Sequence, residues 1–190
     1  MAAPYFLRLK LKDVMNMLVA GIDGSTKCTG ISIMNDGKLE FYTLIDLHKE
    51  KDAMKRIQGM WTEIVKVLDQ YKLDAVYMEK SIDKKNIDTL QKLSYLAGGM
   101  MFYCVQKGIK FVNPFPVEWR AKIGIKQSNK IKRDMLKAEA IIAVKKEYDI
   151  DVNDDVAEAI LICRSAFALP EIELTEDELA EASLWRKQCH

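Results

Sequence analysis

The chain has 190 residues, of which 49% are hydrophobic, and its formal net charge is +1. These values predict one compact domain with an apolar core, and no apolar run approaches the roughly 20 residues of a membrane-spanning helix. Charged residues interrupt the apolar ones near the N-terminus, so we expect no signal peptide. The cysteines lie far apart in the sequence, without the paired spacing of a metal site, and we expect free thiols in a cytoplasmic protein.

The charges are distributed unevenly along the chain. The segment from Lys107 to Lys137 has nine basic and two acidic residues, whereas the segment from Glu147 to Glu181 has twelve acidic residues and only Arg164 as a base. This pattern indicates a surface for a polyanion next to a site for cations. Two solvated helix faces of opposite charge are the alternative.

Hydrophobic periodicity predicts three strands in the first part of the domain. The segment 17–23 is predicted as a buried strand that ends in an acid, apolar residues alternate with polar ones over 29–35, and a third strand is expected over 39–47. The Asp36-Gly37 pair between the second and third strands is typical of a hairpin turn, because both residues accept the left-handed backbone conformation. The three strands therefore form an antiparallel meander.

Helices and short strands are expected to alternate after this meander. The predicted strands cover 73–79 and 109–114, and the predicted helices cover 49–71, 86–106, 116–124, 129–148 and 151–168. This order predicts an α/β fold with a mixed five-stranded sheet, in which three antiparallel strands are followed by parallel strands, flanked by helices.

The chain divides into three predicted regions. We expect an N-terminal extension over 1–17, one folded domain over 18–169 and an acidic C-terminal tail over 170–190. A capping-box pattern at Thr175 and Glu178 predicts that the tail is helical.

Two of the predicted strands end in an acid. Asp23 follows the first apolar run, and Glu79 ends the strand over 73–79. Asp23 alone is explained by turn capping, because Asp before Gly starts many turns. If the two strands are parallel neighbours, however, both acids lie at the sheet edge where open sheets bind their ligands.

A second pair of acids occurs in the sequence NDDVAEAILI. Asp155 and Glu158 are three residues apart and share one face of the predicted helix, and Asp154 is the alternative to Asp155 as a ligand. The small residues Ala157 and Ala159 allow this helix to approach the sheet closely. The alternative is that Asp154 and Asp155 only complement the positive helix N-terminus, which leaves Glu158 unexplained.

Four carboxylates without a histidine or cysteine partner form a hard-oxygen donor set. Such a set suits Mg²⁺ or Mn²⁺ rather than Zn²⁺. Clustered carboxylates repel one another unless cations neutralise them. Two metal ions about 3.5–4 Å apart activate water and stabilise the leaving oxygen in phosphodiester cleavage. The acids and the nearby basic segment together predict a metal-dependent nuclease.

With these residues assembled, the segment from Leu18 to Ala168 resembles the RuvC-type Holliday junction resolvases of the ribonuclease H-like superfamily, most closely their short bacteriophage members. The motifs that carry the resemblance are Gly21-Ile22-Asp23, Thr29-Gly30, Tyr77-Met78-Glu79 and Asp155-Val156-Ala157-Glu158-Ala159. Glu158 stands where the family usually has Asp. The resemblance implies two Mg²⁺ ions per active site, with Mn²⁺ as a substitute, bound by Asp23, Glu79, Asp155 and Glu158. It also implies paired symmetric nicks in four-way junctions or other branched DNA, during recombination and repair.

The resemblance further implies contacts with the DNA. By position, Lys130 best matches the family's base that holds the scissile phosphate, with Arg120 and Lys126 as further candidates. Ile82 takes the place of an aromatic wedge in the loop after the second acid. The full set of predicted DNA-contacting residues is Lys80, Ile82, Lys84, Lys85, Arg120, Lys122, Lys126, Lys130, Lys132 and Arg133.

Two symmetric nicks imply a two-fold homodimer. The helix over 86–106 is the candidate interface, and the alternative is that its apolar stripe belongs to the core. That stripe is expected to comprise Leu90, Leu93, Ala97, Met101 and Cys104. The implied location is the cytoplasm, or the host cytoplasm if a bacteriophage encodes the protein.

Three other functions start from the same residues. Another ribonuclease H-like nuclease, acting on RNA/DNA hybrids or in processing, would use the same acids. An actin-like ATPase shares the hydroxyl-rich turn after Asp23, but it needs two lobes to close on a nucleotide. A DNA-binding module without catalysis has no use for four converging acids. Magnesium titration separates a nuclease, which needs the ion for cleavage, from a pure binder, which does not, and from an ATPase, which would turn over nucleotide.

Overall fold

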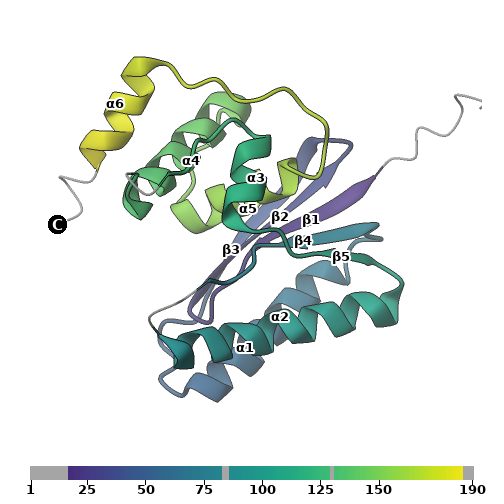
Figure 1. Cartoon of the computed structure of the whole chain (residues 1–190). Coiled ribbons are helices and arrows are strands. Elements are labelled where there is room, and N and C mark those ends of the chain that lie inside the picture. Colours follow the sequence, from purple (N-terminus) through teal and green to yellow (C-terminus); the bar gives the residue numbers. More distant parts are fainter. Residues whose placement is uncertain (1–16, 83–85, 129–130, 186–190) are drawn as a thin grey trace, which may run out of the picture.

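The computed structural model of the chain describes residues 17–82, 86–128 and 131–185. Its sheet consists of β1 (Leu18–Asp23), β2 (Cys28–Asn35), β3 (Lys38–Asp46), β4 (Ala75–Met78) and β5 (Lys110–Val112). The strand order is β3-β2-β1-β4-β5, with β1 antiparallel to β2 and parallel to β4 (Figure 1). The predicted mixed sheet is confirmed. Because β1 and β4 are parallel neighbours, their carboxyl ends lie at one edge of the sheet.

The turn between β2 and β3 has the predicted hairpin geometry. Asp36 and Gly37 both have positive φ angles, of 49° and 80°. Such turns match the right-handed twist of the two strands that they join. β3 is the edge strand, and its exposed and half-buried residues alternate along its whole length.

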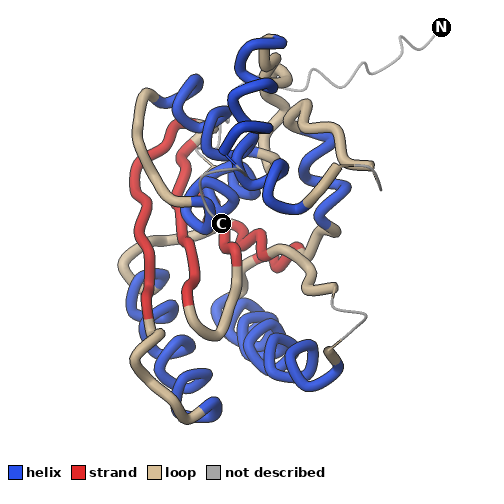
Figure 2. The backbone as a smooth tube through the Cα atoms, turned by 90° about the vertical axis from the view of Figure 1, so that its left-hand side faces the viewer, coloured by secondary structure: helices blue, strands red, loops and turns tan. Residues whose placement is uncertain are grey.

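Helices cover both faces of the sheet (Figures 1 and 2). On one face lie α1 (Ala53–Leu68) and α2 (Ile87–Lys107), and on the other lie α3 (Pro116–Lys122), α4 (Arg133–Tyr148) and α5 (Asp154–Arg164). The two faces have separate apolar cores. α6 (Glu176–Trp185) packs beside α4.

Helix α5 packs unusually closely on β1 and β2. A Cβ atom on Gly21 would lie 2.3 Å from the carbonyl oxygen of Ala159, and one on Gly30 would lie 2.0 Å from the carbonyl oxygen of Asp155. The Ser32 hydroxyl donates a hydrogen bond of 2.9 Å to the Ala159 carbonyl. Residues 156–164 are all buried, so α5 is the central helix of its core. The two glycines therefore set the distance between the acidic helix and the end of β1.

Several helix boundaries differ from those expected. α1 begins at Ala53 rather than at residue 49, because Asp52 caps it by accepting a hydrogen bond of 2.8 Å from the Lys55 amide. α4 begins at Arg133, and Asn129 lies outside the described residues. α5 ends at Arg164 instead of continuing to residue 168.

The expected buried stripe of α2 is partly wrong. Met101 is 43% exposed, and the buried residues of this helix are Leu96, Met100, Tyr103 and Cys104. The core face of α2 is therefore rotated from the predicted stripe by about one residue position, which is about 100° around the helix axis. A second apolar face remains exposed.

The capping box before α6 is confirmed. The Thr175 amide donates a hydrogen bond of 2.6 Å to Glu178, and the Glu178 amide donates one of 3.3 Å to the Thr175 hydroxyl. An ion pair of 2.9 Å between Lys146 and Glu178 connects α6 to α4. The division of the chain at residues 17 and 170 stays a prediction. Across the described residues, the helices are too short or too polar to cross a membrane.

Candidate active site

The four predicted acids come from three elements that meet at one edge of the sheet. Asp23 is the last residue of β1, and Glu79 directly follows β4. The Glu79 amide donates a hydrogen bond of 3.2 Å to the Ile22 carbonyl, which fixes the two acids on adjacent strands. Asp155 and Glu158 lie in the first part of α5, which the close contact at Gly30 holds against the sheet.

The pKa values show that these carboxylates interact. Burial raises the pKa of Asp23 well above its usual range, and the charges of Glu158, Glu79 and Asp155 raise it further. Burial also raises the pKa of Glu79 and that of Asp155, with Glu158 adding to both shifts. A divalent cation would relieve this repulsion. The structure therefore brings the predicted acids into one electrostatic cluster, which we call the carboxylate cluster.

Arg120 belongs to this cluster rather than to the surface. Its guanidinium forms an ion pair with Glu158 and lies 3.9 Å from Glu79. Arg120 is only 6% exposed, because α3 turns it inward beside Trp119. In this position Arg120 balances the charge of Glu158 and Glu79. Its contact with DNA stays a prediction.

Lys137 also lies at the cluster, although the sequence did not indicate it. It forms an ion pair with Asp154 and lies 3.9 Å from Asp155. Its positive charge also lowers the pKa of Asp23. The available signal was its position four residues after Arg133, which places both bases on the same side of α4. Arg133 is exposed, and its charge lowers the pKa of Glu79 and that of Asp155.

Trp119 is a second residue that the sequence did not indicate. Its indole is fully buried, and Nε1 donates a hydrogen bond of 2.6 Å to Oε2 of Glu79. Pro116 at the start of α3 and the side-chain cap by Glu118, which accepts a hydrogen bond of 2.7 Å from the Phe115 amide, fix this short helix. The acid is therefore positioned by a rigid apolar side chain with a single donor.

The remaining predicted DNA-contacting residues divide into two groups. Those that the structure describes are exposed, and Ile82 is 52% exposed. Lys80 lies over the Phe115 ring, with its Nζ atom 4.3 Å from the ring centre. The exposed bases are Lys80, Lys122, Lys126, Lys132 and Arg133. Lys84, Lys85 and Lys130 lie outside the described residues.

The oxygen-only donor set of the carboxylate cluster fits Mg²⁺ or Mn²⁺. Within it, Glu158 is paired with Arg120, and Lys137 lies 3.9 Å from Asp155. Within the described parts of the chain, three donor atoms that all lie within 4.8 Å of one another occur at a different place, formed by Cys28, Asp46 and His48. The cluster of acids thus has the donor chemistry and the unbalanced charge for cations, but its oxygens are spread more widely.

A family profile described as "Crossover junction endodeoxyribonuclease RuvC" matches residues 19–163. The chain belongs to the RuvC family. The RuvC proteins of Dictyoglomus thermophilum and Fusobacterium nucleatum are 27% and 25% identical to it over 155 and 151 residues. These alignments cover 78% and 77% of this chain, and 95% and 78% of the two relatives. The likeness to bacteriophage members stays a prediction.

Solved structures show the same ribonuclease H-like fold. RuvC of T. thermophilus, in complex with a Holliday junction substrate, superposes with a TM-score of 0.63 at 15% identity, covering 78% of this chain and 92% of that one. The Fowlpox virus resolvase, in complex with Holliday junction DNA, gives a TM-score of 0.53 at 15% identity over 79% of this chain and 96% of that one. The RuvC-type resolvase fold predicted from the sequence is confirmed.

Proposed function

We propose that this chain resolves Holliday junctions and related branched DNA by metal-dependent phosphodiester hydrolysis at the carboxylate cluster. The RuvC profile supports an endodeoxyribonuclease. The observation that carries the site is the convergence of the acids: Arg120 contacts both Glu158 and Glu79, and the Glu79 amide is hydrogen-bonded to the residue before Asp23. A protein that only bound DNA would gain nothing from this costly arrangement.

Four acids are the proposed ligands of two Mg²⁺ ions, which Mn²⁺ can replace. They are Asp23, Glu79, Asp155 and Glu158. When bound, the ions supply an activated water and stabilisation of the leaving 3′-oxygen. Trp119 holds the Glu79 carboxylate in place through its indole donor. Arg120 and Lys137 keep part of the negative charge balanced before any cation binds.

Exposed bases next to the cluster are the proposed DNA contacts. Arg133 and Lys132 begin α4, and Lys126 lies in the loop before it. Contacts of such bases with phosphates give binding that weakens steeply with salt. Lys130, which is outside the described residues, remains the proposed partner of the scissile phosphate.

The exposed apolar face of α2 is the proposed interface of a homodimer. Its exposed residues are Ile87, Tyr95, Met101, Phe102 and Val105, with Phe102 65% and Val105 71% exposed. A Cβ atom added to Gly98, in the middle of this face, would meet no atom within 4 Å. A two-fold pair of α2 helices would bury these side chains and place two active sites on one junction.

Cleavage of a labelled four-way junction tests the proposed site. The assay should compare a four-way junction, a fork and a linear duplex as substrates, each in the presence of Mg²⁺, of Mn²⁺ or of a chelator. Asp23→Asn should abolish cutting of the junction while leaving its binding intact or tighter, because the side chain keeps its shape but loses its charge. Asp36→Asn, in the hairpin turn at the other end of β2, is the control and should cut normally. Cutting by Asp23→Asn at the wild-type rate would refute the site, and equal cutting of all three substrates would refute the junction preference.

A further inference from the structure

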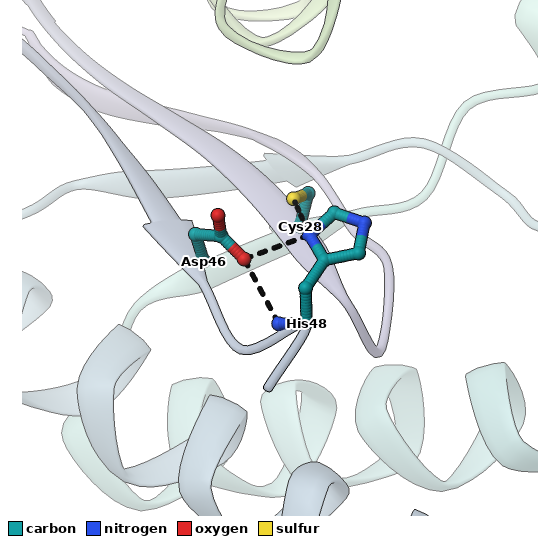
Figure 3. Close-up of side chains that lie close together, drawn as sticks. All are labelled: Cys28, Asp46 and His48. Carbon is teal, nitrogen blue, oxygen red and sulfur yellow. Dashed lines mark hydrogen bonds and ion pairs between the residues drawn. The ribbon is translucent and has the colours of Figure 1, made fainter. Parts of the chain in front are cut away.

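A second group of metal-ligand side chains lies at the same sheet edge as the carboxylate cluster. Cys28, Asp46 and His48 point toward one another, with one donor atom from each within 4.8 Å of the others (Figure 3). Nδ1 of His48 lies 3.2 Å from Sγ of Cys28 and 2.8 Å from Oδ1 of Asp46. None of the three was assigned a role in the nuclease site.

The backbone holds two of these residues directly opposite each other. Cys28 is the first residue of β2 and Asp46 the last of β3, and they are partners in the antiparallel ladder. The Leu47 amide continues the ladder with a hydrogen bond of 2.7 Å to the Lys27 carbonyl. Oδ1 of Asp46 also accepts a hydrogen bond of 2.9 Å from the His48 amide. Donor atoms on paired strands are more precisely placed than those on free loops.

The geometry argues against a nucleophilic Cys-His-Asp triad. In such a triad the nucleophile and the acid contact opposite nitrogens of the imidazole ring. Here the thiol and the carboxylate both contact Nδ1. Burial and the charges of Asp46 and Asp155 also raise the pKa of Cys28 to about 11, so the thiol is not activated as a nucleophile. Three donor atoms that converge on one point are typical of cation coordination instead.

We infer that Cys28, Asp46 and His48 form a Zn²⁺ site, separate from the carboxylate cluster. Sulfur, imidazole nitrogen and carboxylate oxygen are the ligands that Zn²⁺ takes in proteins, whereas Mg²⁺ prefers oxygen alone. A water molecule completes the tetrahedron. Binding of the ion releases the thiol proton of Cys28 and uses the Nδ1 lone pair of His48, so that the ring proton of the bound imidazole is on Nε2.

The side chains have room to adjust to an ion. Ligands at zinc distances of about 2.0–2.3 Å lie roughly 3.3–3.6 Å apart in a tetrahedron. The present separations of 3.2 Å and 2.8 Å therefore have to widen slightly. The His48 and Asp46 side chains are 59% and 57% exposed, so rotation about their own bonds provides this change without moving the ladder.

Cobalt spectroscopy on the full chain tests the site without any nuclease assay. After treatment with a chelator, wild type titrated with Co²⁺ should develop a near-ultraviolet absorption band from thiolate-to-cobalt charge transfer. Zn²⁺ should remove the band and raise the Tm, because the ion binds only the folded ladder. Cys28→Ser should lose the band, and Asp46→Asn and His48→Gln should each weaken Co²⁺ binding by about tenfold or more.

Two controls make the result specific. Glu40→Gln removes another exposed acid from β3 and should bind Co²⁺ like wild type. Asp23→Asn disables the carboxylate cluster and should keep the thiolate band, which separates this inference from the proposed nuclease site. The inference is wrong if wild type shows no thiolate band, or if Cys28→Ser retains it at full intensity. A band that is lost in Asp23→Asn would also overturn it.

Discussion

The indole of Trp119 donates its single hydrogen bond to Glu79, over an Nε1–Oε2 distance of 2.6 Å. Because Trp119 is fully buried, this contact transmits the rigidity of the apolar core to a carboxylate at the end of β4. Arg120, the next residue, forms an ion pair with Glu158 on α5. The short helix α3 thus supports two acids of the cluster, one through an aromatic side chain and the other through a charged one.

Trp119→Phe should lower the rate of junction cleavage about 10- to 100-fold, the usual effect of removing a partner of a metal-binding carboxylate. The hydrogen bond also lowers the pKa of Glu79, so its loss should move the acidic limb of the pH–rate profile to higher pH. Trp61→Phe, in α1 on the other face of the sheet, is the control. An unchanged pH profile in Trp119→Phe would mean that the indole serves packing alone.

Lys137→Met should reduce cleavage by about tenfold or more, because a fixed charge beside a reacting site contributes strongly in a partly buried environment. Lys137 is paired with Asp154 and lies 3.9 Å from Asp155. Lys145→Met is the matched control, since Lys145 is also on α4 and is paired with Asp149 and Asp151, which are largely exposed. Equal rates in the two variants would exclude a role for Lys137 in the site.

Asp23→Asn should stabilise the protein against unfolding in the presence of chelator, and more so at higher pH. The folded-state pKa of Asp23 is raised, so the carboxyl is protonated in both states at low pH and carries no penalty there. As pH rises above the pKa of the unfolded state, the charge of Asp23 lowers the free energy of unfolding, and the effect is complete above the folded-state pKa. Asn carries no charge and avoids this loss. Thermal unfolding at a series of pH values measures the difference.

Asp69→Asn should have the opposite effect on the free energy of unfolding. Hydrogen bonds from Lys107 and Tyr103 lower the pKa of Asp69. Its stabilising effect is therefore present above the unfolded pKa and is lost as pH falls through the folded one. Asp69→Asn should destabilise the protein at neutral pH and match wild type in acid. The same sign in both variants would contradict the burial of charge at Asp23.

Gly30→Ala should destabilise the fold by about 1–3 kcal/mol and reduce cleavage, because overpacking forces backbone to shift. The new Cβ atom would lie 2.0 Å from the carbonyl oxygen of Asp155. Gly59→Ala is the control, since its Cβ atom would meet only the end of the Leu47 side chain at 3.3 Å. Chemical denaturation gives the stability, and a junction assay gives the activity.

Val105→Glu should convert a dimer to a monomer at micromolar concentration, because it places a charge in the proposed α2 interface. Val117→Glu, on α3, makes the same change at a residue that is 52% exposed, and it should remain dimeric. Sedimentation measures both, with circular dichroism as the test of folding. A wild-type protein that sediments as a monomer would refute the interface.

The acids could be predicted because each follows a local pattern. Asp23 and Glu79 end apolar runs, and Asp155 and Glu158 share one helix face, so periodicity alone places them near one another once two strands are parallel. Arg120 and Lys137 could not be distinguished from other bases, because their burial depends on how α3 and α4 pack against α5. The Cys28–Asp46 pairing depends on a register shift between Ile33 and Met34 in the β2–β3 ladder. The predicted turn alone would place Cys28 opposite Ile45.

One helix serves two purposes in this molecule. α5 carries two of the cluster acids in its first turns, while residues 156–164 fill the centre of the core. Heat that loosened the reacting groups would have to open the interior at the same time, so activity and native structure should disappear over a single temperature range.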